Sequence, residues 1–132
     1  MILARESGLT INFEDVANEG FLPKTCLDAS DSDALFAALE ANEAHFKALY
    51  DTANAKGERL KVVAKFNDGK ASFGLKSVDI SHPFYNLDGK DNIFSIKSNR
   101  YPDQALIIRG AGAGAEVTAS GVFSDLMLIV NK

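Results

Sequence analysis

The chain has 132 residues, with 46% hydrophobic and 24% charged residues and a formal net charge of −4, which is ordinary for one globular domain with its own core. The acidic balance without a basic stripe argues against a nucleic-acid partner, and no apolar run is long enough to cross a membrane. With one cysteine, Cys26, and no leader-like pattern at its start, the sequence favours a reducing, cytoplasmic location.

The first predicted element is the last part of a helix, residues 1–7, which Gly8 ends in a left-handed conformation. No capping residue precedes it, and so short a helix is not stable alone. We therefore expect the chain to have been cut from a longer protein. The next predicted elements are a turn with one short helical turn at 9–16, a short strand at 17–22, a break at Pro23 and a loop at 24–29.

Helix signals dominate the stretch that follows. The cluster Ser30–Asp33 offers several N-cap side chains. Apolar residues then recur at helical spacing as far as Lys56, and Gly57 ends the pattern. The apolar face shifts near Asn42, so the pattern fits two helices joined by a break as well as it fits one.

The later parts of the chain show the alternating, β-branched pattern of strands. Residues 60–66 and 70–78 flank Asn67–Lys70, where the Asp-Gly pair predicts a tight hairpin turn. Further along, the sequence predicts a strand at 92–98, a turn at Tyr101–Asp103 and a buried apolar strand at 105–108. This order of elements predicts an α+β fold, with a mixed or antiparallel sheet, helices mainly on one face and a C-terminal helix.

The most distinctive stretch is the last strand, which is followed by Gly110, Gly112 and Gly114 and then by a predicted helix. A strand, a glycine turn and a helix together direct free backbone N–H groups and the helix dipole toward an anion. The glycines fit the dinucleotide fingerprint only loosely, and the 17 residues after Ala115 leave no room for the second strand that such a fold needs. The residues alone therefore allow an anion-facing loop or a tight β-to-α connection.

Other chemistry-bearing residues have structural explanations. His45 lies inside the helical region, His82 lies at a proline bend, and Cys26 has no basic partner nearby in the sequence. These three residues lack zinc-like spacing. The aspartates between residues 28 and 33 lack the glycine and closing glutamate of a calcium loop, so helix capping explains them. We expect no metal site.

Three ordered stretches together resemble homoserine dehydrogenases. Residues 109–126, Arg-Gly-Ala-Gly-Ala-Gly-Ala-Glu-Val-Thr-Ala-Ser-Gly-Val-Phe-Ser-Asp-Leu, resemble the C-terminal signature of that family. Residues 82–93, His-Pro-Phe-Tyr-Asn-Leu-Asp-Gly-Lys-Asp-Asn-Ile, and residues 2–8, Ile-Leu-Ala-Arg-Glu-Ser-Gly, agree with it in order and spacing. The segments Asp91–Ile93 and Arg100–Tyr101 look most like the bifunctional aspartokinase–homoserine dehydrogenase branch.

The resemblance implies a parent enzyme that reduces aspartate semialdehyde to homoserine with NADPH or NADH, on the route to threonine and methionine. Such an enzyme has a Rossmann domain and a second α+β domain that holds the substrate and the homodimer interface. By this resemblance, residues 1–109 are the latter part of the substrate-binding and dimerisation domain. Residues 110–132 are the glycine loop and a helix that returns to the missing Rossmann domain.

The resemblance also places the family's catalytic lysine and aspartate, and its dinucleotide fingerprint, upstream of this chain. It therefore implies no catalytic residue here. It assigns cofactor contact to Gly112, Ala113 and Gly114, to Gly114 most of all, and gives Thr118 a supporting place in the first helical turn. We expect the chain to be inactive alone and not to bind NADP or NAD tightly. The alternatives are a non-enzymatic dimerisation module and a small phosphate- or nucleotide-binding module.

Overall fold

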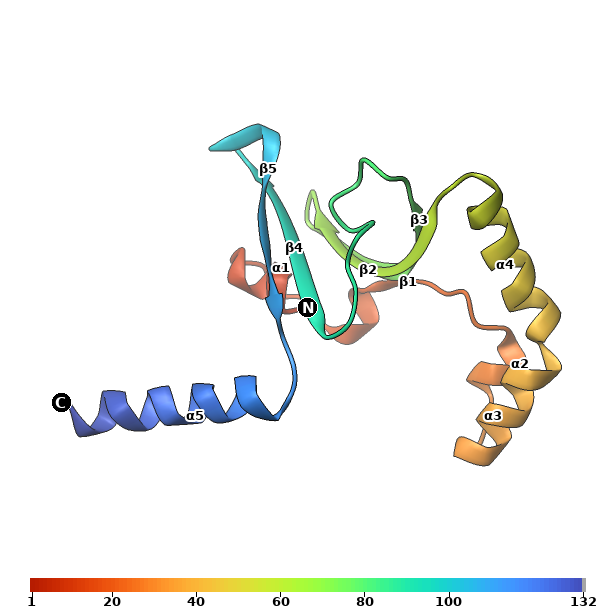
Figure 1. The fold of residues 1–132 in the computed structure, drawn as a ribbon, viewed down its shortest axis with the longest axis horizontal. Helices are drawn as coiled ribbons and strands as arrows, with labels where there is room; N and C mark the ends of the chain where they lie inside the picture. Colours follow the sequence, from red (N-terminus) through yellow and green to blue (C-terminus); the bar gives the residue numbers. More distant parts are fainter. Residues whose placement is uncertain (132) are drawn as a thin grey trace. The chain divides into compact units, whose positions relative to one another are not determined.

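The computed structural model describes residues 1–131, which form helices and two small sheets in two compact units, Met1–Ile80 and the stretch from Ser81 onward (Figure 1). In chain order the elements are α1 (Ile2–Glu6), the 3-10 turn η1 (Phe13–Asp15), β1 (Ala17–Glu19), α2 (Lys24–Leu27), α3 (Ser32–Ala41), α4 (Glu43–Ala55), β2 (Arg59–Asn67), β3 (Lys70–Val78), β4 (Asp91–Ser98), β5 (Tyr101–Ala111) and α5 (Ala115–Val130). The predicted α+β class and the C-terminal helix are confirmed. Over residues 1–131, no helix combines the length and apolarity needed to span a membrane.

The sheet of the first unit has three strands in the order β1-β3-β2. Strands β2 and β3 are antiparallel, and the turn between them has positive φ at Asp68 (49°) and Gly69 (73°). Positive φ at both central residues is typical of a tight hairpin turn, so the Asp-Gly prediction is confirmed. Strand β1 runs parallel to β3 and places Glu19 opposite Gly74.

Most short elements before residue 30 follow the sequence, with one correction. Helix α1 ends before Gly8, which has a φ of 88°, and η1 is the single helical turn expected within 9–16. The expected strand is confined to β1. The predicted loop at 24–29 is wrong, because residues Lys24–Leu27 form α2 with Pro23 as its N-cap residue. Proline is well tolerated at the start of a helix, because the first N–H groups of a helix have no partner within it and the missing N–H of proline costs nothing there.

A small apolar core joins the N-terminal segment to β3. Ala4, Ile11 and Ala71 are buried, and Val16 and Phe66 pack against them. Among the residues described, no large side chain is fully enclosed, that is, less than 2% exposed. The first unit therefore has a thin core, and its stability depends strongly on each close backbone contact.

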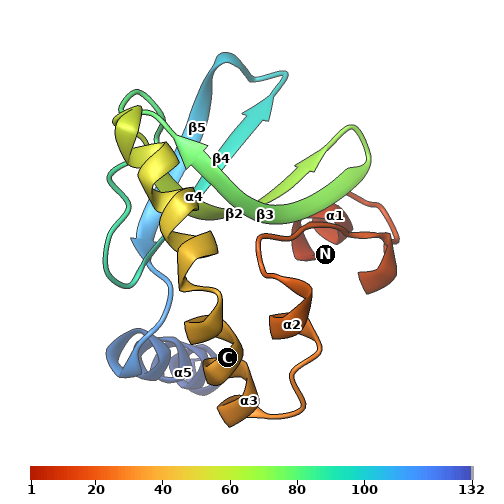
Figure 2. The same cartoon turned by 90° about the vertical axis from the view of Figure 1, so that its right-hand side faces the viewer.

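The helical region consists of the two helices α3 and α4 (Figure 2), and Asn42 is the residue between them. The side-chain amide of Asn42 donates to the carbonyl of Ala38 at 2.7 Å and to the hydroxyl of Thr25 at 3.1 Å. It thus takes the place of the backbone donor that would continue α3, and it ties α2 to α3. The sequence left one helix and two helices equally open, and the structure shows two helices, α3 and α4, joined by a break at Asn42.

The N-cap of α3 gives the first testable prediction. One carboxylate oxygen of Asp31 accepts the backbone N–H of Ala34 at 2.8 Å. This hydrogen bond, and a second from the hydroxyl of Ser30, hold the pKa of Asp31 below its ordinary value. Because the pKa is lower in the folded chain, the stabilisation is full above the ordinary carboxyl pKa and is lost as the pH falls through the folded-state value.

We expect Asp31→Ala to lower the Tm by a few degrees at neutral pH and by less in acid. Asp31→Asn is the matched control, because its amide oxygen still accepts the N–H of Ala34 and does not titrate. Thermal melts at neutral and acidic pH would measure both variants. An equal loss of Tm by Asp31→Ala at the two pH values would contradict the role of the charged cap.

The second unit contains the antiparallel hairpin of β4 and β5, followed by α5. The predicted turn at Tyr101–Asp103 is wrong: Tyr101 lies opposite Ser98, and the turn falls on residues 99–100. Pro102 is tolerated in β5 because each strand of a two-stranded sheet has a free edge. The predicted burial of 105–108 is also wrong, since Ile107 is 40% and Ile108 52% exposed. No second layer among the described residues of this unit covers the hairpin.

Candidate functional site

The site indicated by the sequence lies where β5 passes into α5. Gly112, Ala113 and Gly114 form this connection, here called the glycine corner. Gly114 is the N-cap residue of α5 and has a φ of 119° and a ψ of 158°, a conformation that is essentially restricted to glycine. Among residues 1–131, no side chain caps the first turn of α5, so its N–H groups are available to a ligand.

Thr118 supports the corner from the helix side. Its backbone N–H and its hydroxyl both donate to the carbonyl oxygen of Gly114, at 3.1 and 3.0 Å. These two bonds fix the plane of the peptide between Gly114 and Ala115. The N–H of a trans peptide is directed opposite to its carbonyl, so the N–H of Ala115 is directed away from the helix body. Thr118 thereby orients a backbone donor at the corner.

The hairpin supports the corner from the other side. The N–H of Gly112 donates to the carbonyl of Lys90 at 3.4 Å, and the carboxylate of Asp91 pairs with Nε of Arg109 at 2.9 Å. The Lys90 ammonium lies 3.6 Å from the position that a Cβ on Gly114 would take. Sequence reasoning missed Lys90 in this position. The pairing of β4 with β5 brings Lys90 beside the glycine corner, and the sequence alone does not give the register of that pairing.

The charges around the corner are mixed. Lys90 brings one positive charge, while Glu116 in the first turn of α5 brings a negative one. A phosphate cradle normally combines backbone donors with unopposed positive charge. The glycine corner instead offers bare backbone that a flat or weakly polar group can approach closely. The corner can contact and orient such a group through its backbone. Thr118 carries the only hydroxyl within residues 112–118, and that hydroxyl already donates to the carbonyl of Gly114.

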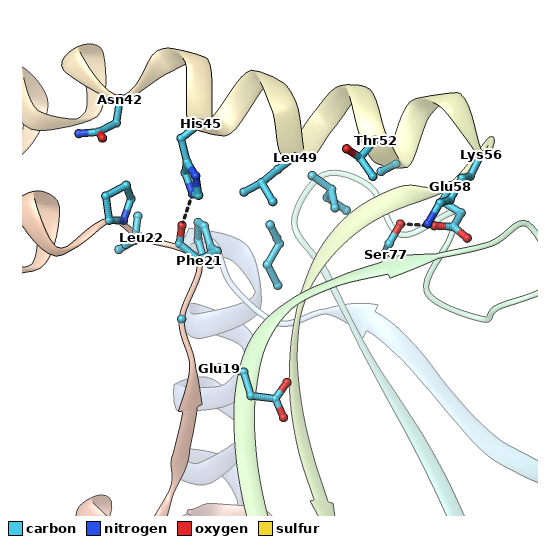
Figure 3. Close-up of a pocket in the computed structure, with 15 residues that line it drawn as sticks. Glu19, Phe21, Leu22, Asn42, His45, Leu49, Thr52, Lys56, Glu58 and Ser77 are labelled. Carbon is cyan, nitrogen blue, oxygen red and sulfur yellow. Dashed lines mark hydrogen bonds between the residues drawn. The ribbon is translucent and has the colours of Figure 1, made fainter.

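A second candidate is a groove of about 630 Å³ in the first unit, between α4 and the sheet (Figure 3). Its apolar part includes Leu49 from α4, Leu60 from β2 and Leu75 from β3. The segment that follows β1 closes one side with Phe21, Leu22 and Pro23. The groove therefore lies where α4 and the sheet leave their shared apolar space incompletely filled.

The polar groups of the groove are engaged in structural hydrogen bonds. Nε2 of His45 lies 2.8 Å from the carbonyl oxygen of Phe21 (Figure 3). At the other end, the hydroxyl of Ser77 donates to the carboxylate of Glu58 at 2.5 Å. Glu19 pairs with Lys76, whose hydrogen bond and positive charge lower the pKa of Glu19. These side chains therefore have structural partners, and none of these contacts joins two groups placed to act as a general acid and a general base.

The remaining candidates from the sequence also have structural places. Nδ1 of His82 accepts the backbone N–H of Phe84 at 3.1 Å, which confirms its part in the bend. Cys26 is a buried free thiol. The capping role of Asp31 is confirmed by its bond to Ala34. Within residues 1–131, no group of three His, Cys, Asp or Glu side chains is arranged to hold a metal ion.

Comparison with known proteins gives a consistent result. The family model described as Homoserine dehydrogenase matches residues 1–127. Among curated proteins, the chain is 36% identical to the bifunctional aspartokinase/homoserine dehydrogenase of Haemophilus influenzae and 39% identical to bifunctional aspartokinase/homoserine dehydrogenase 2 of Escherichia coli. Both matches cover 96% of this chain but 16% of the relative. The chain thus spans about one sixth of the length of these relatives.

A chloroplastic relative from Zea mays, bifunctional aspartokinase/homoserine dehydrogenase 2, is 35% identical over 99% of this chain and 14% of its own length. Among solved structures, the chain resembles a Candida auris protein described as of unknown function, with a TM-score of 0.81 and 36% identity. That match covers 99% of this chain and 37% of the solved chain.

Proposed function

Because the chain belongs to the homoserine dehydrogenase family, we propose that it is the C-terminal part of an enzyme that reduces aspartate semialdehyde to homoserine with NADPH or NADH. In this proposal, residues 1–109 belong to the substrate-binding and dimerisation domain. Residues 110–132 carry the glycine corner and the helix that packs on a Rossmann domain. The cytoplasm is the proposed location, although relatives such as that of Zea mays are chloroplastic.

The observation that carries the proposal is the glycine corner within a family match that covers residues 1–127. The nicotinamide cofactor would supply the hydride. Gly112 and Ala113 would contact its ring end through their backbone groups, and Gly114 would provide the turn that only glycine adopts readily. Thr118 would hold that turn in place through its two bonds to Gly114. The mixed charges at the corner favour a nicotinamide end over a phosphate.

The proposal predicts activity only in a longer product. The complete product of the gene should reduce aspartate semialdehyde with NADPH, whereas residues 1–132 alone should show at least about a thousandfold lower turnover, because hydride transfer needs a bound cofactor and a positioned proton donor. The turnover of both proteins is measured from the loss of NADPH absorbance. Appreciable turnover by residues 1–132, or a natural gene product that begins at Met1, would contradict the proposal.

One observation favours a second candidate, a dimerisation module. The large apolar side chains of α5 are 42% to 76% exposed, and they are Val117, Val122, Phe123, Leu126, Met127, Leu128, Ile129 and Val130. So large an apolar surface around one helix is typical of an element that another chain or domain covers. We therefore expect residues 1–132 to self-associate.

Sedimentation over a range of concentrations tests this expectation. Leu126→Glu and Ile129→Glu together should shift the chain toward the monomer, while Ser124→Glu on the same helix is the control for added charge. A clean monomer at high concentration would count against the dimerisation module. Saturable NADPH binding by residues 1–132 alone would instead favour a free-standing nucleotide binder.

A further inference from the structure

Gly112 differs from Gly114 in the reason why glycine is needed. Gly114 has a positive φ of 119°, whereas Gly112 is absent from the glycines with positive φ. Its backbone is therefore open to any L residue. A methyl group built on Gly112 would nevertheless lie 2.7 Å from Cγ of Asn92 and 3.3 Å from its Cβ, and closer still to the side-chain nitrogen. The space beside Gly112 is already filled.

The register of the hairpin explains how Asn92 reaches this space. Asn92 pairs with Gly110. Gly112 lies two residues after Gly110, just past the end of β5, and positions two residues apart in an extended chain lie on the same side. A Cβ on Gly110 would meet nothing within 4 Å. The side chain of Asn92 thus leans along the hairpin toward the glycine corner, over the backbone of Gly112.

An added methyl group on Gly112 could be accommodated only in part by rotation of a side chain. Rotation of the Asn92 amide can relieve its contacts with an added methyl group on Gly112, but Cβ of Asn92 is fixed by the backbone and would remain at 3.3 Å. An alanine at position 112 must therefore expel the amide and also move β4 and the corner slightly apart.

We propose that Asn92 is a positioning residue of the glycine corner. Its side chain occupies the place of the missing side chain of Gly112 and so sets the spacing between β4 and the loop that receives the nicotinamide cofactor. This inference rests on the proposed function for its effect on the cofactor. The contact between Asn92 and Gly112 is independent of the proposed function.

A double-mutant cycle in the complete gene product tests the proposal through the Kd for NADPH, measured by fluorescence. Gly112→Ala should weaken binding about tenfold, and Asn92→Ala should weaken it about threefold. Together they should weaken it no more than Gly112→Ala alone, since the shortened residue 92 has no amide for the new methyl group to expel and only the contact with its Cβ remains. If the two sites are independent, the fold-changes multiply to about thirtyfold, and the proposal is overturned.

The control is Gly110→Ala, which adds a methyl group on the same side of β5 into open space. In the double variant with Asn92→Ala, the fold-change in the Kd for NADPH should equal the product of the two single fold-changes. A structural readout is independent of the cofactor: NMR on residues 1–132 should show contacts between the side-chain amide protons of Asn92 and the α-protons of Gly112. Their absence overturns the inference. If those contacts appear but wild-type product binds no NADPH, the proposed function fails while the steric pairing stands.

Discussion

Gly74→Ala is expected to destabilise the first unit by about 3 kcal/mol, near the upper end of the usual cost of overpacking. Gly74 lies on β3 directly opposite Glu19 of the parallel strand β1. A methyl group on Gly74 would stand 2.7 Å from Cβ of Glu19 and 3.1 Å from its carbonyl carbon, and closer still to its carbonyl oxygen. Backbone atoms cannot turn aside as a side chain can, so β1 must move away from β3.

The loss of this pairing has wider consequences because β1 is only three residues long, Ala17–Glu19. Displacement of one residue removes much of the strand. It also disturbs the ion pair between Glu19 and Lys76 and the segment at Phe21 that closes the groove. We therefore expect hydrogen exchange to accelerate first in residues 17–19 and their partners on β3.

Denaturant unfolding of residues 1–132 measures this effect, and Gly20→Ala is the matched control. Gly20 lies one residue beyond β1, and a methyl group there would meet only the side chain of Asn18, at 3.4 Å or more, which is ordinary contact. Gly20→Ala should change the free energy of unfolding by less than about 1 kcal/mol. Equal effects of the two substitutions would contradict the close approach of β1 to β3.

Gly114→Val is expected to reduce kcat/KM for NADPH in the complete gene product by at least about a hundredfold, consistent with the cost of misplacing reacting groups. The φ of 119° and ψ of 158° at Gly114 are strongly disfavoured for a β-branched residue. The chain would leave this conformation, and the carbonyl of Gly114 would lose its alignment with Thr118. The first N–H groups of α5 would then be directed elsewhere.

Gly121→Ala is the control for Gly114→Val. Gly121 lies inside α5 and has open space around it, so alanine there should preserve kcat/KM and strengthen the helix by about 0.5–1 kcal/mol. Circular dichroism would show that both variants retain their helix content. Gly114→Val with wild-type kcat/KM would exclude the glycine corner from the cofactor site.

Local signals in the sequence determined much of this protein. The Asp-Gly turn between β2 and β3, the cap at Asp31 and the strand–glycine–helix order all depend on residues close together in the chain. Their physics is short-range, because it concerns φ angles and hydrogen bonds within a few residues. The resemblance of residues 109–126 likewise indicated the family from the order of the amino acids alone, and the family match over residues 1–127 confirms it.

Other features were decided only by the tertiary structure, because they depend on strand register and on what covers each face. The exposure of Ile107 and Ile108 could not be inferred from their apolar character, since burial requires a second layer. The same holds for the approach of Glu19 to Gly74 and of Asn92 to Gly112. In each case the sequence shows a glycine, but only the pairing of the strands identifies the neighbour that requires it.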